Sequence, residues 1–158
     1  MKELKKVLTS NHVIRFSDCD SFQHLHNTRY IDYFLHAREY QIINEYDLNP
    51  YELFHTKKVG WVVVENSIKY FKPARIMEEV IVETTLIDWG PKYVLIEMLM
   101  WDIDKKVLKS ILWTKFVHIS VQTQKAIDHS EELQDLFRAI VKPIQASTLD
   151  ERITDFQA

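Results

Sequence analysis

A long apolar helix that follows a short polar loop is the feature that most constrains the fold. Residues 30–46 place Tyr, Ile, Phe, Leu and Ala on nearly every side of the predicted helix. Residues 47–50 end it, because the residue before Pro50 disfavours the α region. A helix with apolar side chains nearly all round is usually buried. We therefore expect this helix to lie at the centre of the molecule.

Four strands are predicted after this helix and one before it. Short turn-forming sequences separate segments rich in β-branched and aromatic residues, which cover residues 12–16, 61–71, 80–87, 93–101 and 107–120. An amphipathic helix is predicted after Ser130. This order predicts an α+β fold, with an antiparallel sheet of about five strands wrapped round one long central helix, plus a C-terminal helix. We expect residues 1–158 to form a single domain, with residues 1–10 and 146–158 loosely ordered.

The later strands carry apolar residues on both faces. In residues 93–101, Tyr, Leu and Trp on one side oppose Val, Ile and Met on the other. A sheet with one face in water should alternate apolar and polar residues instead. We therefore expect a second layer over the outer face. Because few helices remain in the sequence, we predict that another subunit supplies this layer, in a homodimer or a homotetramer.

Composition excludes several classes of function. A net charge of −3 argues against nucleic-acid binding, which needs clustered Lys and Arg to neutralise phosphates. The two glycines, Gly60 and Gly90, are too far apart for a phosphate-binding loop. No apolar run is long enough for a bilayer and the N-terminus lacks a signal-peptide core, so we expect no membrane partner. A single cysteine, Cys19, cannot form an internal disulfide, and we predict a cytoplasmic protein.

The polar loop before the helix gathers the groups that could do chemistry. Asp20 and His24 can handle protons. The helix start leaves backbone N–H groups unpaired, and Asn27 or Thr28 could cap it. An acid, an imidazole and N–H donors at a buried helix start suit chemistry on a carbonyl, although Asp20 could also be only a turn or capping residue. His24 and His26 could suggest a metal, but no further ligand follows at useful spacing, so we predict none.

Two segments of the chain form a recognisable pattern. The first reads D-C-D-S-F-Q-H-L-H-N-T-R-Y from Asp18 to Tyr30, and the second reads Y-F-K-P-A from Tyr70 to Ala74. They resemble the D-x-D-x-x-[GQ]-H-V-N-N-x-x-Y and Y-x-x-P-A segments of hotdog-fold thioesterases. That family includes 4-hydroxybenzoyl-CoA, acyl-CoA and plant acyl-ACP thioesterases. The predicted element order also agrees with the hotdog fold, a sheet wrapped round one helix.

This resemblance implies hydrolysis of an acyl-CoA or acyl carrier protein thioester at a dimer interface, with no metal or other cofactor. Asp20 matches the catalytic carboxylate, acting as general base or nucleophile. Asn27 matches the position whose backbone N–H polarises the thioester carbonyl. His24 matches the histidine of the signature and could either orient the reactants or be a buried histidine with its hydrogen bonds satisfied. Two departures bear on the mechanism: His26 replaces the first Asn of the signature, and Phe22 stands where the plant enzymes have Asn.

Four more residues are candidate substrate contacts. Asn66, on the predicted second strand, should face the helix, where it could orient the water or touch the acyl group of a neighbouring subunit. Arg29, Lys72 and Arg75 could meet the phosphates of coenzyme A. Their alternative role is that of ordinary solvated surface charges.

The residues beside Asp20 are given lesser roles. Asp18 is expected to hold the loop, and Cys19 is a poor nucleophile because its acidic neighbours disfavour the thiolate. Two other functions stay open. One is a hydratase or dehydratase that acts on acyl thioesters through a His with an acidic partner. The other is a non-catalytic module that binds an acyl ligand.

Overall fold

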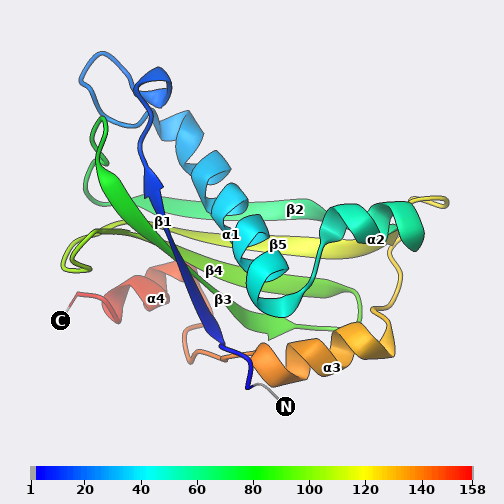
Figure 1. Ribbon diagram of the computed structural model, residues 1–158. Helices are drawn as coiled ribbons and strands as arrows, with labels where there is room; N and C mark the ends of the chain where they lie inside the picture. The colour runs from blue at the N-terminus through cyan, green and yellow to red at the C-terminus, as the bar shows by residue number, and fades with distance from the viewer. Residues whose placement is uncertain (1–2, 158) are drawn as a thin grey trace.

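Helix α1 (Tyr30–Tyr46) lies across one face of a five-stranded antiparallel sheet in the computed structural model, which describes residues 3–157 (Figure 1). The strands are β1 (Val7–Val13), β2 (Val59–Tyr70), β3 (Glu79–Trp89), β4 (Tyr93–Asp102) and β5 (Leu108–Ser120), in the spatial order β1-β3-β4-β5-β2. The remaining elements are the 3-10 turns η1 (Phe16–Asp18) and η2 (Asn27–Arg29) and the helices α2 (Pro50–Thr56), α3 (Glu131–Ile140) and α4 (Leu149–Thr154). The predicted α+β hotdog fold is confirmed.

Helix α1 buries one side against the sheet and leaves the other side exposed. The buried side chains recur at helical spacing and are Tyr30, Phe34, Ala37, Arg38 and Gln41. The helix ends where the sequence indicated, at Asp47, which adopts a left-handed conformation with φ 52°. Asn49 then caps α2 by accepting hydrogen bonds from two backbone N–H groups. None of the helices within residues 3–157 has the length and apolar composition that crossing a membrane requires.

The inner face of the sheet, toward α1, forms the main core. Its most buried side chains come from three strands and are Val82, Leu86, Ile96, Met98, Met100 and Leu112. In β2 the ladder shifts between Val63 and Glu65, as happens where an extra residue forms a β-bulge. The shift puts Val62 and Ile68 on opposite faces, although simple alternation predicts that they share one.

The outer face of the sheet is covered by the chain's own C-terminal segment. Four apolar residues of this segment pack on strands β3 to β5, and they are Ile144, Leu149, Ile153 and Phe156. On α4, Arg152 forms a bidentate ion pair with the buried Glu97, at 2.8 Å and 3.0 Å. On this part of the outer face the cover is the chain's own C-terminal segment, whereas we had expected a second subunit there. Residues 149–154 form a helix, although we predicted loose order for residues 146–158.

Strand β1 begins earlier than the sequence indicated. We predicted a strand at residues 12–16 and loose order before it, but β1 starts at Val7 and pairs with β3 throughout its length. Leu8 is its one buried residue, and its polar neighbours Thr9 and Asn11 are exposed. A strand with so few apolar residues gives a weak sequence signal. The residues after it form η1, which leads into the polar loop.

Candidate active site at the start of the central helix

Asp20 lies in a tight turn that its own carboxylate stabilises. The Oδ1 atom accepts hydrogen bonds from the backbone N–H groups of Phe22, at 2.9 Å, and His24, at 3.3 Å. The backbone N–H of Asp20 donates to the carbonyl of His24 at 2.9 Å, and Gln23 completes the turn with a left-handed φ of 62°. Within residues 3–157 the other carboxylate oxygen, Oδ2, accepts no hydrogen bond. The turn therefore holds a half-buried carboxylate with one oxygen left for another partner.

The Asp20 turn is held in place by the segment that follows β2. Backbone hydrogen bonds join residues 23–25 to that segment, and His24 pairs with Arg75 in an isolated bridge. The structure thus brings Arg75 beside the Asp20 turn. Lys72 is exposed in the same segment, three residues earlier. Both cations are therefore available to a ligand that approaches this loop from solvent.

The 3-10 turn η2, which leads into the central helix, is capped by a residue that we did not predict. The Nδ1 atom of His26 accepts a hydrogen bond from the backbone N–H of Thr28 at 3.2 Å, a role that we expected for Asn27 or Thr28 itself. The carbonyl of Asn27 accepts from the hydroxyl of Tyr70 at 3.0 Å. Its backbone N–H has no acceptor in the part of the chain that the structure describes. Asn27 therefore offers an N–H donor directly before α1, in the loop that holds Asp20.

Asp18 ties the loop to α1, as expected, although through side chains rather than through backbone groups. The hydroxyl of Tyr33 donates to its Oδ2 atom at 2.5 Å, and Nε of Arg15 donates at 3.1 Å. The bond from Tyr33, more than the one from Arg15, lowers the pKa of Asp18. Burial raises the pKa of the Cys19 thiol, and the charges of Asp18 and Asp20 raise it further. Cys19 is therefore unsuited to act as a nucleophile.

Two predicted contacts lie away from Asp20 in this chain. Arg29 forms an ion pair with Asp32 at 3.5 Å and lines a separate polar groove beside β1. Asn66 lies on the inner side of β2 and accepts a hydrogen bond from Thr114 at 2.7 Å. Neither side chain hydrogen-bonds to the Asp20 turn within residues 3–157. Nowhere in residues 3–157 do three or more His, Cys, Asp or Glu side chains form a group that could hold a metal ion.

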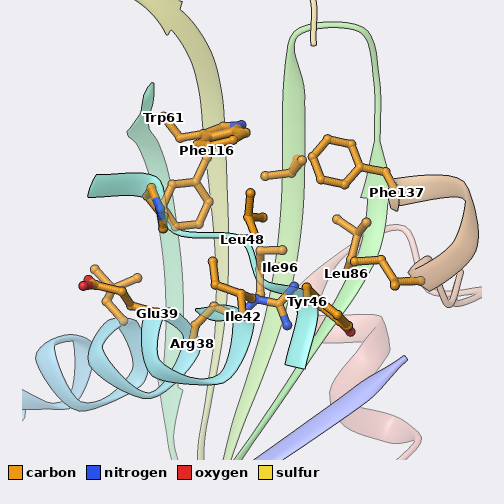
Figure 2. Close-up of a pocket in the computed structure, with 14 residues that line it drawn as sticks. Arg38, Glu39, Ile42, Tyr46, Leu48, Trp61, Leu86, Ile96, Phe116 and Phe137 are labelled. Carbon is orange, nitrogen blue, oxygen red and sulfur yellow. The ribbon is translucent and has the colours of Figure 1, made fainter. Parts of the chain in front are cut away.

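An apolar cavity of about 290 Å³ lies between the second half of α1 and the sheet (Figure 2). Its walls come from α1, the loop after it, the sheet and α3, and include Ile42, Leu48, Trp61, Phe116 and Phe137. None of the residues that we predicted for the site lines it. Sequence reasoning missed this cavity because its walls are composed like an ordinary core.

Strand β2 runs from the cavity to the start of α1. On the inner face of the sheet, Tyr70, Ile68, Asn66 and Trp61 follow one another in that order. Tyr70 contacts the carbonyl of Asn27 at one end, and Trp61 lines the cavity at the other. Asn66 therefore lies between the helix start and the cavity.

The chain resembles characterised thioesterases in sequence. The long-chain acyl-CoA thioesterase FadM of Escherichia coli (strain K12) is 26% identical over 130 residues, which make up 82% of this chain and 96% of FadM. A match of this length in a chain of 158 residues includes α1 and the strands β2 to β5.

Solved structures share the fold. A 1,4-dihydroxy-2-naphthoyl-CoA thioesterase from Synechocystis has a TM-score of 0.75 and 16% identity, covering 85% of this chain and 95% of its own. A Staphylococcus aureus protein solved in complex with CoA has a TM-score of 0.77 and 14% identity, covering 94% of both chains.

The family model of the thioesterase-like superfamily matches residues 14–137 of the sequence. The chain therefore belongs to the thioesterase-like superfamily, and the predicted thioester hydrolase is confirmed.

Proposed function

We propose that the chain hydrolyses acyl-CoA thioesters, with Asp20 as the catalytic carboxylate. The observation that carries this proposal is the Asp20 turn, which fixes one carboxylate oxygen and leaves the other without a partner in residues 3–157. The N–H donor of Asn27 lies in the same loop. Two similarities support coenzyme A as the thiol: FadM is an acyl-CoA thioesterase, and the Staphylococcus aureus protein was solved with CoA.

In the proposed reaction, Asp20 takes a proton from a water molecule whose oxygen attacks the thioester carbonyl. Negative charge develops on the carbonyl oxygen, where the N–H of Asn27 stabilises it, by about 3–4 kcal/mol if it acts like other oxyanion donors. The C–S bond then breaks, the thiolate takes up the proton, and the free acid and thiol leave. In the alternative route, Asp20 attacks the carbonyl itself and the C–S bond breaks, which leaves an anhydride and the thiolate. Water then hydrolyses the anhydride to the free acid and the Asp20 carboxylate, and its proton goes to the thiolate.

The other residues of the loop are proposed to position the reactants. His24 has an orienting role, because its backbone holds the carboxylate of Asp20 and its ring stacks on Phe22 at 6.4 Å between centroids. Lys72 and Arg75, exposed beside the turn, are proposed to bind the phosphates of coenzyme A. Arg29 could join them only if the nucleotide reaches the polar groove beside β1.

The proposed working form is a homodimer joined along β2. This strand lies at an edge of the sheet, and its side chains Val62, Val63 and Val64 are 42%, 43% and 54% exposed. A long apolar edge strand is a ready template for pairing with another chain. We propose that this pairing brings Asn66 toward the acyl group bound by the neighbouring subunit. Size-exclusion chromatography with light scattering would separate the homodimer from the homotetramer, our other predicted assembly.

Replacing Asp20 by Asn tests the proposed reaction. We expect kcat on acyl-CoA substrates to fall by about 10²–10⁴-fold, because the amide cannot accept the proton from water or attack the carbonyl. Asn keeps the acceptor that stabilises the turn, so the thermal unfolding midpoint should hardly change. Asp135→Asn, on the exposed side of α3, is the matched control and should keep full activity. A normal kcat in Asp20→Asn would contradict the proposal.

The same thiol-release assay separates the alternatives. Faster release from acyl carrier protein than from coenzyme A would change the proposed thiol but not the reaction. Binding of acyl-CoA without release on any chain length would favour a non-catalytic module. A hydratase or dehydratase needs an acid–imidazole pair, and within residues 3–157 the hydrogen bonds between Asp20 and His24 involve only the backbone of His24.

A further inference from the structure

The apolar cavity has a buried guanidinium in its wall. Arg38 is 7% exposed and lines the cavity from α1. Its Nη1 donates to the hydroxyl of Thr84 at 2.9 Å, and its Cζ lies 5.9 Å from the ring centroid of Tyr46. No Asp or Glu within residues 3–157 forms an ion pair with it. Against the effect of burial, Tyr46 raises the pKa of Arg38, partly through a side-chain hydrogen bond, but Thr84 and Tyr46 are both neutral partners. Because a guanidinium has five N–H donors, several stay available to a ligand in the cavity.

This cation is fixed in position and keeps its charge. Burial lowers the pKa of Arg38 to about 10, so the guanidinium stays protonated at neutral pH. Thr84 donates its own hydroxyl proton to Gln41 at 2.5 Å, so that its oxygen lone pairs are free to accept from Arg38. Glu39 also lines the cavity, but its carboxylate points away from the guanidinium (Figure 2). A buried charge is costly unless a partner is supplied, and the described residues supply no anion here.

We propose that Arg38 binds a carboxylate at the far end of the acyl chain, so that the preferred substrates are ω-carboxylated acyl thioesters. The inference rests on the proposed function and deepens it by naming the substrate class. Ile42, Leu86 and Ile96 give the cavity an apolar wall for the methylene chain. Arg38 is the group best suited to a terminal carboxylate, because its planar fork binds both oxygens. An unsubstituted chain would leave the same guanidinium buried against methyl groups.

The dimensions agree with a chain of medium length. The rise of 1.5 Å per residue puts Arg38 about 12 Å along α1 from its start at Tyr30. That distance corresponds to an extended chain of roughly ten carbon atoms. The cavity, at about 290 Å³, is close to the smallest volume typical of ligand sites, which suits one chain and excludes the bulk of coenzyme A.

The test compares two thioesters of equal length on the full-length protein. Decanedioyl-CoA carries a free carboxylate at the end of its chain, and decanoyl-CoA carries a methyl group. We expect kcat/KM to be at least about tenfold higher for decanedioyl-CoA, with the preference falling for chains some four carbons shorter or longer. An equal or lower kcat/KM for the carboxylated substrate at every length would overturn the inference.

Arg38→Met, which keeps the volume and removes the charge, should abolish or reverse this preference. Arg38→Lys should restore part of it, because the ammonium keeps the charge but loses the fork. Arg152→Met is the matched control: it also removes an arginine that is shielded from solvent, here a partly buried one on the outer face of the sheet, and should leave the ratio of the two kcat/KM values unchanged. If Arg38→Met lowers both values equally, Arg38 is only structural and the inference is wrong.

A binding measurement separates this inference from the proposed function. Decanoate, which carries a carboxylate but no thioester, should raise the thermal unfolding midpoint of the wild-type protein but not that of Arg38→Met, whereas decan-1-ol should act similarly on both. If no acyl-CoA is hydrolysed, the proposed function fails. The binding of decanoate then still decides whether Arg38 forms a carboxylate site. Equal stabilisation of both proteins by decanoate, or of neither, would overturn it.

Discussion

Each face of the sheet holds one arginine that is shielded from solvent, fully for Arg38 and partly for Arg152, and the two are partnered in different ways. On the outer face, Arg152 meets Glu97 in a bidentate pair, and this hydrogen bond raises its pKa. On the inner face, Arg38 faces a cavity with no acidic partner in residues 3–157, and burial lowers its pKa to about 10. A paired cation joins two parts of the chain, whereas an unpaired cation at a cavity is available to a ligand. The contrast separates an arginine that holds the fold from one that we assign to binding.

Breaking the outer pair should have the largest effect on stability. Glu97→Gln leaves the partly buried Arg152 with only the exposed Asp155 as a counter-ion and weakens the bond to the indole N–H of Trp113, so we expect a loss of about 3 kcal/mol in the free energy of unfolding. Urea denaturation measures it. Asp155→Asn, which removes only the exposed partner of Arg152, should cost less than about 1 kcal/mol. Similar losses in the two variants would contradict the structural role of the buried pair.

The second largest effect should come from acid, which lowers the free energy of unfolding through the buried His129. His129 accepts a hydrogen bond from the indole N–H of Trp61 and lies 4.7 Å from the ring of His118. Burial, together with the nearby His118, lowers the pKa of His129 to about 4. Because the unfolded chain binds this proton more readily, the contribution of neutral His129 to stability should be complete above pH 6.5 and fall by about 2–3 kcal/mol as the pH drops to 4. Thermal unfolding at a series of pH values measures this loss. A smaller loss of stability in His129→Gln than in the wild type would identify His129 as the group, and an unchanged pH profile would contradict this assignment.

Removing Arg38 should affect stability least. Arg38→Met loses one hydrogen bond to Thr84 but also removes the desolvation cost of an unpaired charge, so we expect the free energy of unfolding to change by less than about 1 kcal/mol. Urea denaturation of Arg38→Met and Glu97→Gln under the same conditions compares their free energies of unfolding. A loss as large as that of Glu97→Gln would mean that Arg38 holds the fold after all.

Strong local signals explain what the sequence predicted well. The end of α1 and the cap of α3 followed from Pro50 and Ser130, because each acts through its own backbone neighbours. The strands from β2 to β5 followed from dense β-branched and aromatic residues. The Asp20 loop was identified through its resemblance to a known signature, while the roles of its residues stay predictions.

The features that sequence reasoning missed depend on contacts between distant residues. Nothing local to Arg152 indicates that Glu97, 55 residues earlier, is its partner. His26 caps the 3-10 turn η2 before α1, although histidine is not a preferred cap. Arg38 did leave a signal that we did not use. It stands four and eight residues after Phe34 and Tyr30, on the side of α1 that faces the core, where a charged residue is unexpected.

The left-handed backbone at Gln23 has a consequence for how the loop tolerates change. Glycine enters this conformation freely, whereas a side chain adds roughly 1–2 kcal/mol of local strain, which explains why the signature accepts Gly at this position. A β-branched residue such as Val would resist the conformation more strongly still. Gln23→Val should therefore displace the carboxylate of Asp20 and abolish thioesterase activity without altering any group that we expect to touch the substrate.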